Sequence, residues 1–254
     1  MKKRIVFITD CVDVAYNELR ATVLSMTKER NDIEIEPVVP VAPFSVINGN
    51  FILRLMAEVY PKGTIFSVIL NPMKKRPARL IGRTKKKDFI FVGANTGVFD
   101  WFLRDFGVKE LYELRDPGFL PFGGKFVHAP AVAQVATGKP LKELGKPFKS
   151  AQISRPRLSK GTVVHIDNFG LMKFVGKLPA ANEGDQFVVN ANGKVIEAVF
   201  AKRMMSRDDG EWVIYPGSSL GLPELGKVRS NGVQELNLRI GDKILFEKRS
   251  TALA

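Results

Sequence analysis

A chain of 254 residues, 45% of them hydrophobic, is long enough to bury the core of one large domain or two smaller ones. Its one cysteine, Cys11, excludes an internal disulfide framework and a cysteine-based metal cluster. No run approaches the roughly 20 apolar residues of a membrane span, and the start MKKRIVFITD lacks the apolar core of a signal peptide. We therefore expect a cytoplasmic protein without a membrane partner.

The first part of the chain alternates between strand-like and helix-like segments. In chain order we expect a strand at residues 3–10, a helix at 14–30, an extended segment at 33–41, a helix at 48–60, a strand at 64–71, a strand at 88–97 and a short helix at 98–107. This alternation favours an α/β domain with a largely parallel sheet, placed at residues 1–150. Asp10 would lie at the carboxyl end of the first strand, where open α/β sheets bind ligands.

The second part of the chain changes to short β-rich runs separated by NG, DDG and GD turns. These runs are residues 161–170, 185–202, 211–217 and 233–248. Their spacing predicts a smaller all-β, barrel-like domain at residues 151–254, with the Pro- and Lys-rich stretch at 139–157 as the connector. His165 lies in one of these strands, where alternation puts Val163 and Asp167 on its face, and we interpret it as a structural histidine.

Two basic segments account for the net charge of +13. Lys74–Lys87 holds eight basic residues and no acid, and Lys139–Lys160 is also strongly basic. Neither segment interleaves aromatic residues with its charges as a single-strand binder would, so we favour solvated loops over a nucleic acid partner. The only two histidines are far apart in the sequence, and we expect no metal site.

Six separated motifs resemble one known family in their order along the chain. They are ITD at 8–10, PVVPVAPFSVINGNFIL at 37–53, YPKGTIFSVILNP at 60–72, FVGANTG at 91–97, FGGKFVHAPAVAQVATG at 122–138 and GTVVHIDNFG at 161–170. Together they are similar to the S-adenosylmethionine hydroxide adenosyltransferase family, a relative of the chlorinating and fluorinating enzymes that use the same substrate. The resemblance implies an α/β domain followed by a β-barrel domain. It also implies a homotrimer that binds S-adenosylmethionine between the first domain of one subunit and the second domain of its neighbour, with no separate cofactor.

The resemblance also implies a reaction, in which water attacks the ribose 5′ carbon and methionine leaves as a neutral thioether. The family pattern for activating the water contains an Asp, an Arg and a His. This sequence has Asn71 at the Asp, Ala78 at the Arg with Arg79 one step along, and Gly123 at the His. An amide cannot take a proton from water at neutral pH, so a base at Asn71 is lost.

The substrate-binding pattern is better kept. By resemblance, Asp10 would accept hydrogen bonds from the ribose hydroxyls, and Asp167 would receive the methionine ammonium group. Ser218 and Ser219 resemble the turn that meets the methionine carboxylate. Asn95 and Thr96 stand in the segment before the first-domain helix, and Leu171 replaces an Asn that faces the adenine. The structural alternatives are an Asx or N-cap role for Asp10 and a turn role for Asp167.

Several functions stay open at this point. The chain could hydrolyse S-adenosylmethionine to adenosine and methionine with a rearranged residue set, or it could bind the nucleoside without catalysis. A halide nucleophile is a third possibility, since the small Gly123 resembles the halogenating branch, although the extra loop of that branch is missing. A fourth is binding of an anionic nucleotide or nucleic acid by the basic segments.

Overall fold

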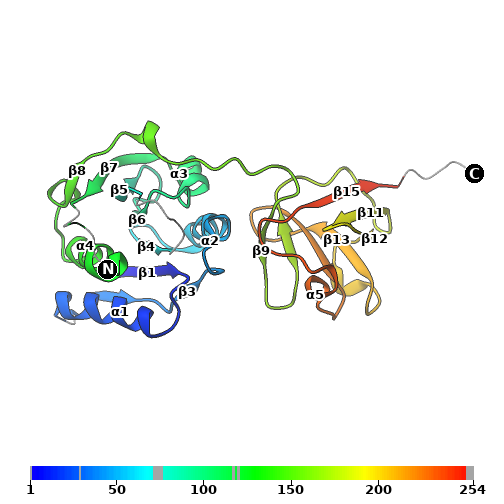
Figure 1. Ribbon diagram of the computed structural model, residues 1–254, viewed down its shortest axis with the longest axis horizontal. Coiled ribbons are helices and arrows are strands. Elements are labelled where there is room, and N and C mark those ends of the chain that lie inside the picture. The colour runs from blue at the N-terminus through cyan, green and yellow to red at the C-terminus, as the bar shows by residue number, and fades with distance from the viewer. Residues whose placement is uncertain (1, 29, 71–76, 116–117, 119–120, 250–254) are drawn as a thin grey trace, which may run out of the picture. The chain divides into compact units, whose positions relative to one another are not determined.

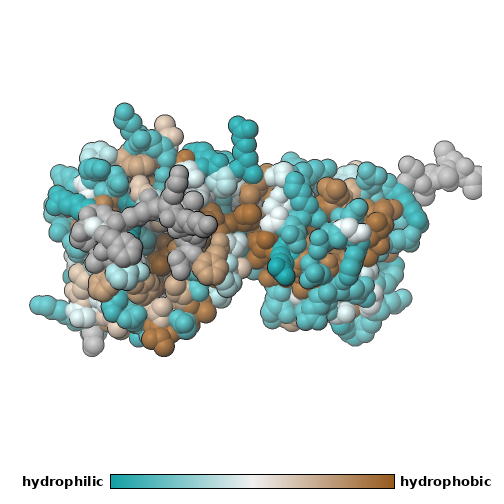
Figure 2. Space-filling model, viewed as in Figure 1, coloured by the Kyte–Doolittle hydropathy of each residue, from teal (hydrophilic) through white to brown (hydrophobic). Residues whose placement is uncertain are grey.

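The structure is a computed structural model that describes residues 2–28, 30–70, 77–115, 118 and 121–249. It divides into two compact units, Met1–Pro156 (unit 1) and Arg157–Ala254 (unit 2), and Figure 1 labels many of their helices and strands. The domain boundary predicted after residue 150 lies a few residues before the boundary between the units, which follows Pro156. On the face that Figure 2 shows, hydrophilic side chains cover most of unit 2, whereas unit 1 has a mixture of hydrophilic and hydrophobic side chains. Among the described residues, none of the helices combines the length and the apolar character needed to traverse a lipid bilayer.

Unit 1 contains a mixed sheet rather than the largely parallel sheet that we predicted. Its strands are β1 (Lys3–Thr9), β2 (Ile33–Ile35), β3 (Val39–Pro40), β4 (Ile65–Ile69), β5 (Arg79–Thr84), β6 (Ile90–Ala94), β7 (Val108–Leu114) and β8 (Gly145–Pro147). They are ordered β2-β1-β4-β6-β5-β7-β8, with β3 beside the end of β1. The β1, β2, β3, β4 and β6 pairings are parallel, whereas β5, β7 and β8 pair antiparallel. The prediction was wrong here because the charged segment at 79–84 reads as a loop but forms a strand.

Helices cover both faces of this sheet (Figure 1). They are α1 (Val14–Thr27), α2 (Val46–Val59), α3 (Asp100–Phe106), the π-helical turn η1 (Gly124–His128), α4 (Ala129–Ala136), and the 3-10 turns η2 (Leu141–Glu143) and η3 (Ser150–Gln152). Because side chains alternate along a strand, Ile5 and Phe7 of β1 face α1 and α4, while Phe66 of β4 faces the aromatic residues of α3. The three helices predicted for unit 1 are confirmed.

Unit 2 is a curled sheet. Its elements are β9 (Val163–Ile166), β10 (Met172–Phe174), β11 (Gln186–Ala191), β12 (Lys194–Phe200), the 3-10 turn η4 (Met204–Ser206), β13 (Trp212–Pro216), β14 (Pro223–Lys227), α5 (Gly232–Leu236) and β15 (Ile244–Lys248). The strand order is β15-β11-β12-β13-β14-β10-β9, and only β12 and β13 pair in parallel. The N–H of Val163 donates to the carbonyl of Asp242 at 2.8 Å, which joins the two edges of the sheet. A barrel-like β unit is therefore observed.

Two local predictions in unit 2 were wrong. Residues 233–236 were read as part of a β run, but they belong to α5, which Asn231 caps by accepting from the N–H of Gln234. The strand β9 contains an irregularity, since Val163 pairs with Phe174 whereas His165 pairs with Lys173. This bulge turns Val163 into the barrel core and places His165 on the opposite face, so the two do not share a face.

Candidate ligand-binding site

The carboxyl ends of the parallel strands β1, β4 and β6 meet at one edge of the unit 1 sheet, which we call the carboxyl edge. Asp10 directly follows β1, and Asn95 and Thr96 directly follow β6. The antiparallel strand β5 begins at the same edge, because Arg79 pairs with Ala94. Four of the predicted site residues therefore gather where open α/β sheets bind ligands. Asn71, which follows β4, lies outside the described residues.

The carboxylate of Asp10 is held by the loop that precedes α2. Its Oδ2 accepts the backbone N–H of Phe44 at 2.9 Å, and its Oδ1 lies 3.7 Å from Cys11 Sγ. Burial raises the pKa of the Cys11 thiol, and the negative charge of Asp10 raises it further. The thiol is therefore protonated at neutral pH, and the carboxylate oxygens of Asp10 can accept hydrogen bonds from ligand hydroxyls.

Arg79 and Gly123 lie against each other. Gly123 precedes η1 with a helical backbone, at φ −58° and ψ −27°. A Cβ atom at this position would lie 2.1 Å from Nη2 and 2.7 Å from Cζ of Arg79. The guanidinium group thus occupies the space that a side chain at position 123 would need. The side chains possible at these two positions therefore depend on each other. The sequence motifs did not reveal this, because they place the family arginine at Ala78, one residue before Arg79.

Asn95 and Thr96 have partners within unit 1. The side-chain amide of Asn95 donates to the carbonyl of Gln152 at 3.0 Å, and its Oδ1 accepts the N–H of Ser154 at 2.8 Å. Thr96 is buried, and its hydroxyl lies 3.5 Å from the carbonyl of Ala94. These contacts fasten the last residues of unit 1 to the end of β6. A ligand contact by Asn95 or Thr96 stays a prediction.

In unit 2, Asp167 organises a tight turn. Its Oδ1 accepts the N–H groups of Phe169 and Leu171 at 3.0 and 2.9 Å, as an Asx turn does. Ser218 and Ser219 lie in the turn between β13 and β14, and the carbonyl of Ser219 accepts the N–H of Leu222 at 3.2 Å. Both predicted positions thus lie in turns, and their contact with a ligand stays a prediction.

A row of polar side chains, which the sequence analysis missed, crosses four strands between these two turns. His165 pairs with Lys173, Lys173 pairs with Glu224, and Glu224 pairs with Tyr215 in the strand register. Directly paired residues share a face, so the four side chains lie on the face opposite the barrel core. We call these four residues the polar row. The signal for it was a charged residue inside the apolar run at 172–174 and another in β14.

The members of the polar row are linked by short contacts. Lys173 Nζ lies 3.2 Å from Glu224 Oε1 and 4.0 Å from Asp167 Oδ2, and the hydroxyl of Tyr215 donates to Glu224 Oε2 at 2.9 Å. Burial, with the nearby charge of Glu224, raises the pKa of Tyr215 far above its ordinary value. Burial and the charge of Lys173 lower the pKa of His165, so the imidazole is neutral at pH 7.

The polar row connects the predicted residues of unit 2. A Cβ atom at Gly217 would lie 2.1 Å from Glu224 Oε1, so the turn that carries Ser218 starts directly against this carboxylate. At the other side, Asp167 faces Lys173, which pairs with Glu224. Asp167 and the serine turn therefore adjoin one ion pair. In the described part of the chain, no three His, Cys, Asp or Glu side chains converge to hold a metal ion.

Comparison with known proteins gives the family. The model of the SAM hydroxide adenosyltransferase N-terminal domain matches residues 5–145. The chain belongs to the SAM hydroxide adenosyltransferase family. A comparison with curated proteins gave no match.

Solved structures share the fold of this family member over most of its length. A structure described as an uncharacterized conserved protein from Thermotoga maritima has 24% identity and a TM-score of 0.81, covering 96% of this chain and 100% of its own. A conserved hypothetical protein from Thermus thermophilus has 20% identity and a TM-score of 0.77, covering 97% of this chain and 100% of its own. At these identities the likeness establishes the fold.

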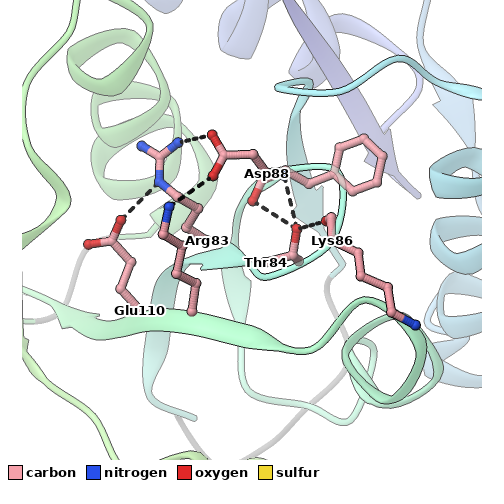
Figure 3. Close-up of polar contacts among 7 residues, drawn as sticks. Arg83, Thr84, Lys86, Asp88 and Glu110 are labelled. Atoms are coloured by element: carbon pink, nitrogen blue, oxygen red, sulfur yellow. Dashed lines mark hydrogen bonds and ion pairs between the residues drawn. The ribbon is translucent and has the colours of Figure 1, made fainter.

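In this family member, the described part of the basic segment Lys74–Lys87 follows β5 along its length, from the carboxyl edge of the sheet to the opposite ends of the strands. Arg79 starts β5 at the carboxyl edge, while Arg83 at the other end forms ion pairs at 2.9 Å with Asp88 and with Glu110 (Figure 3). Lys87 Nζ donates to three backbone carbonyls at the end of α2, at 2.7 to 3.3 Å. These side chains therefore stabilise the β5–β6 turn and α2.

Proposed function

We propose that the protein binds S-adenosylmethionine at the carboxyl edge of unit 1 through its nucleoside end. The observation that carries this proposal is the position of Asp10 directly after β1, on a chain that belongs to the SAM hydroxide adenosyltransferase family. A carboxylate with two acceptor oxygens suits a pair of ribose hydroxyls, and Phe44 orients it through one hydrogen bond.

A second candidate function is slow hydrolysis of the bound ligand, and the contact of Arg79 with Gly123 favours it. In this reaction the water oxygen forms a bond to the ribose 5′ carbon, the bond from that carbon to sulfur breaks, and one proton passes to solvent. The products are adenosine and methionine. Because the sulfonium leaves as a neutral thioether, no acid is needed at the leaving group, and a cation such as Arg79 can orient the water. Because this chain has Asn71 where the family has an Asp that acts as a general base, we expect a low rate of hydrolysis.

Calorimetric titration with S-adenosylmethionine, followed by chromatography for adenosine and methionine, tests both proposals. Asp10→Asn preserves the shape and the acceptor for Phe44 but removes the charge, so we expect about 10- to 100-fold weaker binding. Asp32→Asn is the matched control, because Asp32 lies in an exposed pair with Arg30. Equal affinity of the Asp10→Asn and wild-type proteins would contradict the binding proposal.

Product formation separates the two candidates. Turnover that Arg79→Ala abolishes while binding persists supports hydrolysis, whereas binding without product supports a nucleoside carrier or sensor. The homotrimer implied by the resemblance stays a prediction, and light scattering of the purified protein tests it.

A further inference from the structure

The loop that holds the Asp10 carboxylate contains a tight turn at residues 42–45. The N–H of its last residue donates to the carbonyl of its first at 3.1 Å. Pro43 is the second residue, and Phe44, the third, has φ +59°, in the left-handed region. This is the pattern of a type II turn, in which the third residue is usually Gly or Asn. A phenylalanine in this conformation is rare and unfavourable.

The left-handed conformation of Phe44 aims its N–H at Asp10. Turns of types I and II differ in ψ of the second residue and φ of the third, so the central peptide is turned over between them. In the 42–45 turn this peptide joins Pro43 to Phe44, and its N–H donates to Asp10 Oδ2 at 2.9 Å. With a relaxed, negative φ at Phe44 the same N–H would point away from the carboxylate. The contact with Asp10 therefore requires the unfavourable conformation.

Asn48, in the first turn of α2, fastens both ends of the 42–45 turn. The residue is buried, and its Oδ1 accepts the N–H of Ala42, where the turn begins, at 2.9 Å. Its own N–H donates to Ser45 Oγ, where the turn ends, at 3.2 Å. In an ordinary capping box the side chain at this helix position accepts the N–H of the cap residue. Here the N–H of Ser45 already donates to Ala42, so the side chain of Asn48 reaches back to the start of the turn.

We propose that Asn48 is a positioning residue for Asp10, because it keeps the 42–45 turn in the strained conformation that aims the N–H of Phe44 at the carboxylate. This inference rests on the proposed function, which gives Asp10 the ribose hydroxyls of the ligand. A backbone N–H on one carboxylate oxygen restricts the rotation of the carboxylate, so its remaining lone pairs keep one direction toward a ligand. Asn48 thus acts on ligand affinity through the turn, from a buried position in α2.

Amide hydrogen exchange of the ligand-free protein, followed by NMR, tests the hold on the turn. Asn48→Ala removes the acceptor for Ala42, so Phe44 can relax, and its amide should exchange at least about tenfold faster. Thr84→Ala is the matched control. Thr84 is also buried, and its Oγ1 accepts the N–H of Phe89 at 2.9 Å in the turn between β5 and β6, at the opposite end of the sheet (Figure 3). The control should speed up exchange at Phe89 and leave Phe44 unchanged.

Calorimetric titration with S-adenosylmethionine tests whether the turn matters for the ligand. We expect Asn48→Ala to raise the Kd about 3- to 10-fold and Thr84→Ala to leave it unchanged. Glycine adopts a positive φ without steric cost, so Phe44→Gly should let the turn keep its conformation without Asn48. In the Phe44→Gly background, Asn48→Ala should therefore change the Kd by less than about twofold. Any contact of the Phe44 ring with the ligand is absent from both proteins of that comparison.

The outcomes separate the two proposals. Faster exchange at Phe44 with an unchanged Kd would overturn the inference and leave the proposed function standing. An equal loss of affinity in the wild-type and Phe44→Gly backgrounds would also overturn it, because Asn48 would then act by supporting α2 in general. If Asn48→Ala does not fold, rescue of its folding by Phe44→Gly supports the inference, and failure of the double variant to fold contradicts it. If the wild-type protein does not bind S-adenosylmethionine, the proposed function fails and the positioning of Asp10 for that ligand fails with it.

Discussion

Gly123→Ala should destabilise the wild-type protein but stabilise the Arg79→Ala variant. The backbone of Gly123 is helical, so alanine fits without strain, and the less flexible unfolded chain contributes about 0.5–1 kcal/mol of stability. In the wild-type protein the new methyl group would lie 2.1 Å from Arg79 Nη2. The guanidinium would have to withdraw by more than about 1 Å, and such overpacking costs about 1–3 kcal/mol. The sign of the effect thus depends on Arg79.

A double-mutant cycle measures this dependence. The four proteins are the wild type, the two single variants and the double variant. All four also carry Trp212→Phe, so that Trp101 in unit 1 is the one remaining tryptophan and its fluorescence reports the unfolding of unit 1. Urea denaturation gives the unfolding free energy of each. We expect a coupling of about 1–3 kcal/mol between the two positions.

Gly124→Ala is the matched control for the cycle. A Cβ atom at Gly124 would meet side chains of Ile69, Phe122 and Leu19 at 3.0 to 3.2 Å, and Arg79 is not among these neighbours. Its effect should be the same with and without Arg79. If Gly123→Ala also has the same effect in both backgrounds, the guanidinium does not lie against Gly123 and the hydrolysis proposal loses its support.

Three further predictions concern stability. Lys87→Ala should lower the unfolding free energy by about 1 kcal/mol, because it removes the donor to the carbonyls at the end of α2. Lys86→Ala should change the unfolding free energy by less than about 0.5 kcal/mol. Equal shifts of the melting temperature in the two variants would contradict this prediction. Arg155→Ala takes one arginine from the buried carboxylate of Asp100, so limited proteolysis should cut the end of unit 1 faster. The unfolding free energy should fall as the pH drops below 6.5, because the pKa of His165 is lowered in the folded protein and the unfolded chain binds the proton more readily; urea titrations of His165→Gln should show a smaller fall.

Local periodicity was enough to predict most of the first unit. The apolar runs of β1, β4 and β6 and the helical spacing of α1 and α2 are local signals, and each element appears where expected. The error lies at residues 79–84, where Arg79 and Arg83 gave the segment the appearance of a charged loop. Leu80 and Ile81 between them are fully buried, and this strand makes the sheet mixed. We predicted a loop because the density of charged residues in this segment outweighed its short apolar run.

The candidate site was predictable only where topology determines it. Asp10 follows the first parallel strand, so the rule for open α/β sheets places it at the ligand edge. The contact of Arg79 with Gly123 joins residues far apart in the sequence, and no local pattern encodes it. The polar row depends on the bulge in β9, which changes the face of His165 relative to Val163. A strict alternation of faces cannot anticipate such a shift.

The course of β5 also decides how the basic segment can act. Six residues of extended strand separate its two ends by about 17 Å, so Arg79 and the Arg83–Lys87 turn lie at opposite edges of the sheet. A polyanion that lay along the turn would contact its lysines, and one of them, Lys87, already donates hydrogen bonds to backbone carbonyls at the end of α2. The described part of the segment therefore does not form one continuous cationic surface. Among the described basic residues of the segment, Arg79 alone lies at the carboxyl edge, so a ligand at that edge would meet its guanidinium and not the Arg83–Lys87 turn.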